Sequence, residues 1–275
     1  MNQTIIPILM FLVCFVSACL PAPKQYTELG SYIFDSVETQ SVLVEVDHGE
    51  VIVLGSDDDQ VKIGGQTLFA EEIEYQVSST ENQILIKTHI NRSDLPNASL
   101  QVRVNIPNGM LVKVETESAS VFASNYQGNL EVASTSGNIN VENLIGKITL
   151  QSNRGNITVR ESSGDVAVVG NYGLLNTEDV RGNIALSTIM GNVMFNGLIQ
   201  TGDIVRLETD HGPVVVNLSK HSALGIQVRS TSGDVVCMVP EINSSTRTCD
   251  GEYQSKGGML SVRTVSGAVT MQLIP

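Results

Sequence analysis

The stretch TSGNINVENLIGKITLQSNRGNITV, residues 135–159, carries glycine at positions 137, 146 and 155. Each of these glycines is followed two and four residues later by an aliphatic side chain, as Ile139 and Val141 follow Gly137. The residue between the two aliphatic positions is polar, which is the alternation of a short strand with one buried face. Each unit of nine residues is therefore predicted to consist of one turn and one strand.

The same unit recurs without a break along a large part of the chain. The aliphatic side chain two residues after glycine is always present, and four residues after glycine only Thr177 departs from the apolar rule. A tight turn needs a residue that tolerates positive φ or a close backbone approach, so we place the glycines in the turns. These repeat turn glycines are Gly128, Gly137, Gly146, Gly155, Gly164, Gly173, Gly182 and Gly191. Asn or Asp often follows them, and stacked Asn side chains can form hydrogen bonds along a repeat.

Two such units are predicted to form one coil. Seven residues after glycine, apolar Leu144, Val180 and Leu198 alternate with polar residues such as Thr135 and Asn153. An alternation of this kind means that the true period is about 18 residues. We predict an all-β fold, a right-handed parallel β-helix or solenoid with two strands per coil, in which each strand pairs with its counterpart one coil away.

The domain organisation follows from where this pattern is strict. The parallel β-solenoid is expected over residues 117–275, with looser repeats at 200–218, 230–239 and 265–273. Residues 31–116 alternate as longer strands separated by polar turns, which predicts an irregular all-β N-terminal cap, built as wide coils or as a small packed sheet. The boundary near residue 117 is soft because the composition does not shift there.

The N-terminus is typical of an exported protein. Residues 5–18 are apolar and have the length of a secretory signal, so residues 1–18 are predicted to be a signal peptide and residues 19–30 a Pro-containing tether. Val16-Ser17-Ala18-Cys19 resembles the bacterial lipobox, which implies lipidation of Cys19 and a membrane anchor there. One departure is that the preceding MNQT lacks Lys and Arg. The alternatives are an ordinary signal cleaved nearby or an uncleaved anchor, with Cys19 incidental.

The cysteines support export. Besides Cys14 in the signal and Cys19, only Cys237 and Cys249 are present, and a pair in an oxidising compartment predicts one disulfide. The loop that it closes, CMVPEINSSTRTC, lies near the end of the repeat and is expected to help cover the last coil. Closing a loop of this size contributes about 3 kcal/mol in the chain-entropy model.

Charge and composition exclude several function classes. The net charge is −13, so nucleic acids and anionic lipid headgroups would be repelled. No cofactor or metal is predicted: the four histidines lack ligand spacing, and the repeat lacks the GGxGxD pattern of calcium-binding nine-residue repeats. The histidines are His48, His89, His211 and His221. The dense acidic turn SDDDQ at 56–60 is interpreted as solvated.

No catalytic residue is predicted. Glu178 and Asp179 are adjacent acids near a turn, and Arg160 and Glu161 lie at a similar phase one coil earlier. We interpret these as solvated turn charges. Carbohydrate-active β-helices need carboxylates or basic groups that converge on one face, usually with aromatic platforms for sugars. Aromatic residues make up 4% of this chain, and Trp is absent.

The order of VDHGEVIVLGSDDDQVKI, VNIPNGMLVKVETESASVFAS and the repeated TSGNINV, SSGDVAV and STSGDVV resembles the bacterial β-strand-repeat putative adhesin family, a domain of otherwise unknown function. The resemblance spans residues 40–273 and implies an envelope-associated β-helix without an established catalytic centre. No functional residue is carried over from it.

The resulting hypothesis is a non-catalytic, exported, lipid-anchored cell-envelope protein that acts as an adhesin-like interaction or structural module with a protein or glycan ligand. The alternative is a carbohydrate-active β-helix, a polysaccharide lyase or hydrolase. Three or more acidic, Arg or aromatic side chains converging in a groove on stacked coils would favour the alternative. A surface covered with Ser, Thr and Asn would favour the first hypothesis.

Overall fold

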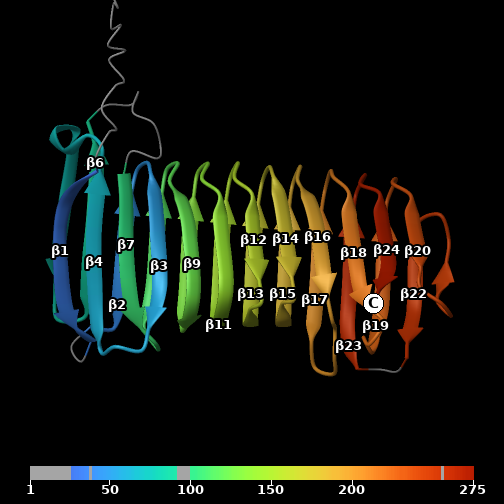
Figure 1. The fold of residues 1–275 in the computed structure, drawn as a ribbon. Helices are drawn as coiled ribbons and strands as arrows, with labels where there is room; N and C mark the ends of the chain where they lie inside the picture. Colours follow the sequence, from blue (N-terminus) through green and yellow to red (C-terminus); the bar gives the residue numbers. More distant parts are fainter. Residues whose placement is uncertain (1–25, 37–38, 92–99, 255–256) are drawn as a thin grey trace, which may run out of the picture.

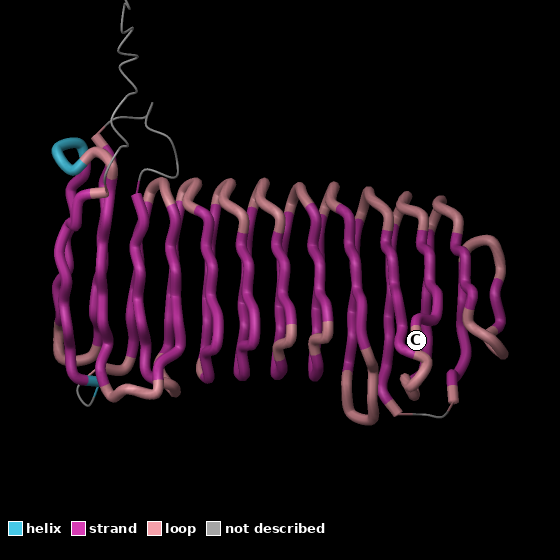
Figure 2. Tube along the Cα trace, in the orientation of Figure 1, coloured by secondary structure: helices cyan, strands magenta, loops and turns pink. Residues whose placement is uncertain are grey.

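In a computed structural model, the β-strands form a long rod (Figure 1). The inward-facing aliphatic side chains of the repeat are buried inside it and stack in register. The structure describes residues 26–36, 39–91, 100–254 and 257–275. In these residues, 24 strands form one continuous sheet that winds around a core, with a 3₁₀ turn at Ala70–Glu72 and no α-helix. Figure 2 shows strands along the whole rod, joined by short turns at its two long edges. The predicted β-solenoid is confirmed.

Two long faces enclose the core, and we call them face A and face B. The strands of face A, in spatial order, are β1 (Thr27–Asp35), β4 (Gln60–Thr67), β7 (Leu100–Pro107), β3 (Glu50–Ser56), β9 (Ser120–Gln127), the first part of β11 (Ile139–Ser152), β12 (Ile157–Arg160), β14 (Leu174–Glu178), β16 (Asn192–Gly197), β18 (Val214–Ser219), β24 (Val269–Ile274) and β20 (Val235–Met238).

Face B lies on the other side of the core. Its strands, in spatial order, are β5 (Ile73–Ser79), β6 (Gln83–Ile90), β2 (Ser41–Val46), β8 (Leu111–Thr116), β10 (Asn129–Ser134), the second part of β11, β13 (Ser163–Gly170), β15 (Arg181–Thr188), β17 (Ile204–Thr209), β23 (Gly258–Thr264), β19 (Leu224–Ser230), β22 (Thr248–Tyr253) and β21 (Asn243–Ser244).

The 18-residue coil is also confirmed. Leu130 pairs with Ile148, Ile148 with Val166, and Val166 with Ile184, each one coil apart and each buried. The next step on this face, from Ile184 to Val205, is longer by three residues because the β16–β17 connection is longer. Because equivalent strands of successive coils stack, each coil buries aliphatic side chains from both of its faces. Burial of each such side chain stabilises the fold by about 1.5–3 kcal/mol.

The repeat glycines fall into two columns, and both are forced by the stacking. At Gly164, φ is +128°, and a Cβ would lie 2.1 Å from the carbonyl oxygen of Gly146. At Gly155 in the other column, a Cβ would lie 1.9 Å from the carbonyl oxygen of Gly137. Two heavy atoms that are not covalently bonded cannot lie this close, so a residue with a Cβ would push the coils apart. Five of the eight glycines lie between strands, whereas Gly146, Gly164 and Gly182 lie within β11, β13 and β15. Close approach between coils is the reason that both columns share.

Asparagine side chains form hydrogen bonds between coils, at a predicted position after a glycine, Asn156, and at other positions. Asn143 donates to the Oδ1 of Asn125 at 2.7 Å, and Asn171 donates to that of Asn153 at 2.9 Å. The Oδ1 of Asn156 accepts the backbone N–H of Leu174 at 2.8 Å. Each bond joins two neighbouring coils, so these bonds reinforce the strand pairing along the rod.

The predicted boundary near residue 117 does not interrupt the sheet, and this expectation needs correction. Strand β2 pairs in parallel with β8, and β3 pairs with β9, so the solenoid already includes residues 41–56. The reason is that segments distant in sequence carry the same alternating pattern and can stack as further coils. Among the described strands at this end, β1, β4 and β5 make antiparallel pairs alone and form a true cap, which joins the parallel coils at β7 and β6.

Both ends of the rod are assembled out of chain order. The coil β2–β3 lies between the coil β6–β7 and the coil β8–β9. At the other end, the coil β23–β24 lies between β17–β18 and β19–β20. The predicted tether is too long as well, because β1 already begins at Thr27. The signal peptide, Cys19 and the rest of the tether lie outside the described residues.

Candidate ligand-binding groove

A groove with a volume of about 780 Å³ crosses five coils on the outer surface of face B. Its floor is one row of outward side chains paired rung by rung: Glu45, Glu115, Ala133, Gln151 and Val169. Ala133 lies in the middle of this row, where a larger side chain would fill the groove. The hollow therefore follows from which residues occupy the outward positions, which have no role in the core.

The wall of the groove consists of the turns that lead from face B to face A. Asp47, Glu117, Thr135, Asn153 and Asn171 line it. Below these residues, hydroxyl groups fix the turns. The backbone N–H of Gly137 donates to Ser134 Oγ at 2.8 Å, and that of Gly155 donates to Ser152 Oγ at 2.9 Å.

This Ser/Thr hydroxyl is a turn element that the sequence reasoning missed. Thr116, Ser230 and Thr264 accept a backbone N–H three residues later in the same way. The signal was present in the sequence. In the set Gly137, Gly155, Gly173 and Gly191, the residue three positions earlier is Ser or Thr, except that Gly173 has Gly170 there. The hydroxyl satisfies a backbone donor that the turn would otherwise leave buried and unpaired.

One end of the groove is acidic. Glu45 pairs with Lys87 at 3.1 Å and Glu115 with Lys113 at 2.6 Å. The hydrogen bond and charge of Glu115, helped by Glu131 and Glu45, raise the pKa of Lys113 above its usual value. Four carboxylates face two lysines here, so this end keeps a negative formal charge. The carboxylates are those of Glu45, Asp47, Glu115 and Glu117.

Two of the four histidines also meet this end. His89 lies 2.8 Å from Asp47, and His48 contacts Ser118 and lies 4.0 Å from Glu117. His211 bonds to Ser266 at 2.7 Å on another coil. Among the described residues, no group of three or more His, Cys, Asp or Glu side chains is placed to hold a metal ion. In the acidic turn 56–60, Asp58 pairs with Lys62, whose hydrogen bond lowers the pKa of Asp58.

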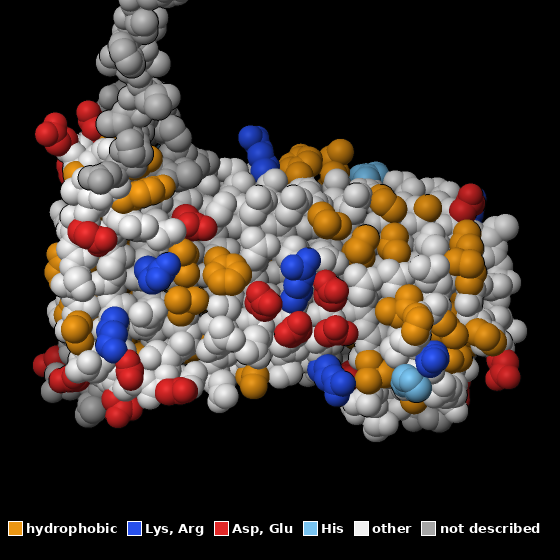
Figure 3. Space-filling view, in the orientation of Figure 1, with side chains coloured by type: hydrophobic (Ala, Val, Ile, Leu, Met, Phe, Trp, Pro, Cys, Tyr) orange, Lys and Arg blue, Asp and Glu red, His pale blue; other side chains and the backbone are white. Residues whose placement is uncertain are grey.

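The other end of the groove is apolar. Val169 lies on its floor, and Asn171 on its wall is followed by Tyr172. In the next coil, Ile189 and Met190 occupy the same two turn positions as Asn171 and Tyr172. The exposed fractions of Val169, Tyr172, Ile189 and Met190 are 47%, 48%, 48% and 55%. Figure 3 shows hydrophobic side chains that stand out on this turn edge near the middle of the rod.

The charged candidates from the sequence lie elsewhere, at the opposite corner of the coil. Arg160 bonds to Glu178 at 3.1 Å across two coils, and both side chains are about half exposed. Glu161 and Asp179, both with positive φ, line a hollow of about 330 Å³ together with Arg181. Acidic and basic side chains gather in the middle of face A in Figure 3. Three charged side chains therefore do converge on stacked coils, the feature that favours the carbohydrate-active alternative.

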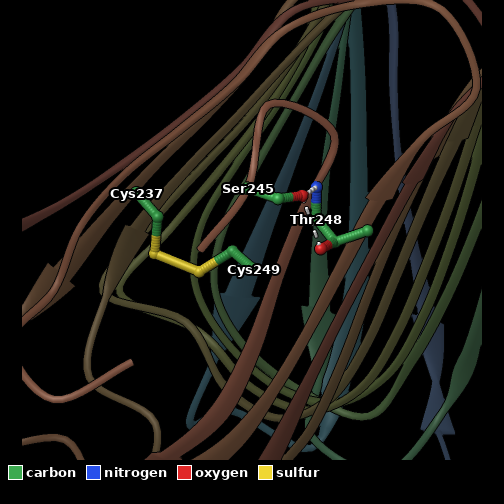
Figure 4. Close-up of a disulfide and its surroundings, with 4 residues drawn as sticks. All are labelled: Cys237, Ser245, Thr248 and Cys249. Atoms are coloured by element: carbon green, nitrogen blue, oxygen red, sulfur yellow. Dashed lines mark hydrogen bonds between the residues drawn. A yellow bond between two sulfur atoms is a disulfide. The ribbon is translucent and has the colours of Figure 1, made fainter. Parts of the chain in front are cut away.

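The structure joins Cys237 to Cys249, the pair inferred from the sequence, with a Cα–Cα distance of 6.3 Å. Cys237 belongs to β20 on face A and Cys249 to β22 on face B, so the bond links the two faces at the end of the rod. Figure 4 shows the pair beside a turn in which Ser245 Oγ accepts the N–H of Thr248 at 3.1 Å. Strand β22 pairs antiparallel with β19 and covers its outer edge.

The described residues include no helix that is long and apolar enough to span a membrane. The chain matches the family model described as Toastrack DUF4097 over residues 36–272. A search of curated proteins found no match.

Several solved structures also match the chain. A putative adhesin from Bacteroides fragilis NCTC 9343 is 11% identical, with a TM-score of 0.52, over 92% of this chain and 98% of that chain. A putative adhesin from Parabacteroides distasonis ATCC 8503 is 11% identical, with a TM-score of 0.36, over 90% and 97%. A putative cell adhesion protein from Clostridium sporogenes ATCC 15579 is 10% identical, with a TM-score of 0.29, over 91% and 100%. At these identities, the first of them supports the fold alone.

Proposed function

The chain belongs to the Toastrack DUF4097 family, and we propose that it is a non-catalytic, exported, lipid-anchored protein of the cell envelope that acts as an adhesin-like interaction module. The observation that carries this proposal is the groove on face B. It crosses five coils and ends in surfaces of different chemistry. The name of the Bacteroides fragilis structure with a similar fold, a putative adhesin, agrees with this role.

The geometry of the groove suits an extended ligand. Neighbouring rungs are about 4.8 Å apart, so a chain lying along the rod meets a new side chain at each step. Gln151, Asn153 and Asn171 offer both hydrogen-bond donors and acceptors there. Contacts of this kind give affinity by summation over several coils.

Export and anchoring are supported by the chain's chemistry. A disulfide between Cys237 and Cys249 is typical of an oxidising compartment. The lipobox-like Val16-Ser17-Ala18-Cys19 ends shortly before β1 begins at Thr27. An anchor at Cys19 would hold the rod close to a membrane by its β1 end.

Binding is tested by screening glycan and peptide arrays with the purified full-length protein. Gln151→Trp fills the groove and should abolish binding of any ligand that uses it. Asn140→Trp is the matched control, because Asn140 is also exposed on the same strand β11 but faces outward from face A. Equal binding by the two variants would contradict the proposal.

Anchoring is tested separately by replacing Cys19. Cys19→Ala should move the protein from the membrane fraction to the soluble fraction, and mass spectrometry of the wild-type N-terminus should find a lipid on Cys19. An unmodified Cys19 in the mature protein would overturn the anchor and leave the groove proposal intact.

The corner hollow favours one second candidate, a carbohydrate-active enzyme. Glu161 and Asp179 lie on adjacent coils beside Arg181, and strands about 4.8 Å apart place carboxylates close to the separation of about 5 Å used by retaining glycosidases. Release of reducing ends from envelope polysaccharides, lost in Glu161→Gln and in Asp179→Asn, would support this candidate. Absence of cleavage by the wild type would remove it.

A further inference from the structure

The turns along the wall of the groove occupy equivalent positions in successive coils, so their exposed side chains can be compared directly. Each turn from face B to face A carries two side chains at its tip. In most turns this pair lies between a Ser or Thr and a glycine, whereas Asn171 and Tyr172 lie between Gly170 and Gly173. In other coils these pairs are polar or mixed, as in Glu117-Ser118, Thr135-Ser136 and Asp210-His211. Two adjacent coils instead expose Tyr172 and the pair Ile189-Met190.

These apolar side chains contribute little to the fold. The backbone bonds that stack the turns are the same throughout: Tyr172 N donates to Asn153 O at 3.0 Å and Met190 N donates to Asn171 O at 2.9 Å. Arg154 N donates to Thr135 O at 3.1 Å in a turn with polar side chains. Single exposed apolar residues are ordinary, but a contiguous group on neighbouring coils marks an interaction surface.

We propose that the groove binds an extended polypeptide segment, with an apolar side chain over Val169, Tyr172, Ile189 and Met190 and a Lys or Arg side chain over the acidic end. This inference rests on the proposed function and names the partner of the same groove. The four carboxylates against two lysines attract a cation and repel anionic polymers.

The acidic end and the apolar end of the groove together indicate the class of partner. A linear chain that carries both a cationic group and an apolar group is typical of a polypeptide. Sugar rings prefer aromatic platforms, and of the four exposed side chains at the apolar end only Tyr172 is aromatic. Asn and Gln side chains between the ends can bond to a peptide backbone.

The length of the segment follows from the strand spacing. From β2 to β15 the surface crosses five strand steps, β2 to β8, β10, β11, β13 and β15. At about 4.8 Å for each step this distance is about 24 Å, which an extended chain covers with about seven residues.

The test uses full-length protein and a library of seven-residue peptides with an aliphatic or aromatic residue at one end and Lys or Arg at the other, beside scrambled controls. Binding is measured by fluorescence polarisation at low and high salt. The double variant Ile189→Thr, Met190→Ser gives this turn the pair already present at Thr135-Ser136, so the fold is preserved. It should weaken binding about tenfold or more, in line with the loss of two apolar contacts.

Two further variants complete the design. Glu115→Gln combined with Glu117→Gln should weaken binding and remove most of its salt dependence. Val265→Thr changes an exposed apolar residue at the same turn position two coils beyond Ile189, outside the proposed seven-residue segment, and should leave binding unchanged. Unchanged affinity in the Ile189/Met190 variant would overturn the inference.

A parallel glycan array separates this inference from the proposed function. If glycans bind, lose binding in Gln151→Trp, and the peptides do not bind, the inference is wrong and the proposed function stands. If no ligand of either class depends on Gln151, both are wrong.

Discussion

The central coils and the two ends of the rod are built by different rules. From β8 to β16, each coil follows the previous one in the chain, and partners such as Ile139 and Ile157 are 18 residues apart. At the ends, Val42 pairs with Val112, and Val214 pairs with Val269. The first and last coils of the described chain are each enclosed between two others, so neither forms an exposed end.

The difference shows how a repeat protein ends its stack of coils without leaving exposed strand edges. A stack of parallel strands has open edges wherever the repeat ends, and those edges invite aggregation. Here antiparallel strands cover the ends of the stack: β1 and β4 on face A, β5 on face B, and β22 beside β19. Contacts between residues far apart in sequence close the loops of the chain and make the ends depend on the whole fold.

The largest expected effect separates whole coils from half coils in the centre. Deleting residues 137–154 removes one coil and brings Gly155 into the position of Gly137, so the protein should fold with a modestly lower Tm. Deleting residues 137–145 would place face B strands on face A and should prevent folding. Circular dichroism melting of both variants checks this, and equal tolerance of the two deletions would contradict the two-strand coil.

A glycine in the centre should be less replaceable than one at the end. Gly164→Ala places a Cβ 2.1 Å from Gly146 O at a φ of +128° and should destabilise the protein by several kcal/mol. Gly64 in β4 has no heavy atom within 4 Å of a Cβ position, so Gly64→Ala is the matched control. We expect it to change the free energy of unfolding by less than about 0.5 kcal/mol. Similar costs at both sites, measured by urea denaturation, would rule out close approach as the cause.

The disulfide tests the C-terminal cap. Reducing Cys237–Cys249, or replacing both residues by Ala, should lower the free energy of unfolding by about 3 kcal/mol, because the loop regains entropy in the unfolded chain. Self-association should increase as the cover of β19 loosens, which light scattering can follow. The double Ala variant is the control for the reductant and should not respond to it. A stable, monomeric reduced protein would show that the cap does not need the bond.

The smallest effect concerns the turn hydroxyl. Ser152→Ala leaves the N–H of Gly155 without its partner at 2.9 Å and should cost about 1 kcal/mol. Ser187→Ala, on the outward side of β15, should cost less than half of that. Chemical denaturation with matched protein concentrations can resolve the difference. A larger loss at Ser187 would mean that the hydroxyl column is not what fixes the turns.

Much of the fold could be predicted from the sequence because the repeat is periodic. Gly146 and Gly164 could be stacked on one another, and Ile148 and Val166 placed in the core, since a strict period of 18 puts equivalent residues on top of one another. The cysteine pair could be inferred as well. The groove could not, because its floor depends on outward residues such as Ala133 and Gln151, whose identity the core does not constrain.

The sequence by itself determined the repeating unit: the spacing of the glycines, alternating strands, a two-strand coil and the pairing of Cys237 with Cys249. Only the tertiary structure decided the order of the end coils, the cover of their edges and the meeting of acidic and apolar residues in one groove. The physical reason is that local alternation specifies which side of a strand faces the core, whereas the choice of neighbouring strand depends on contacts between distant segments. Residues 41–46, 83–90 and 111–116 share that alternation, and their order in space follows from assembly of the whole chain.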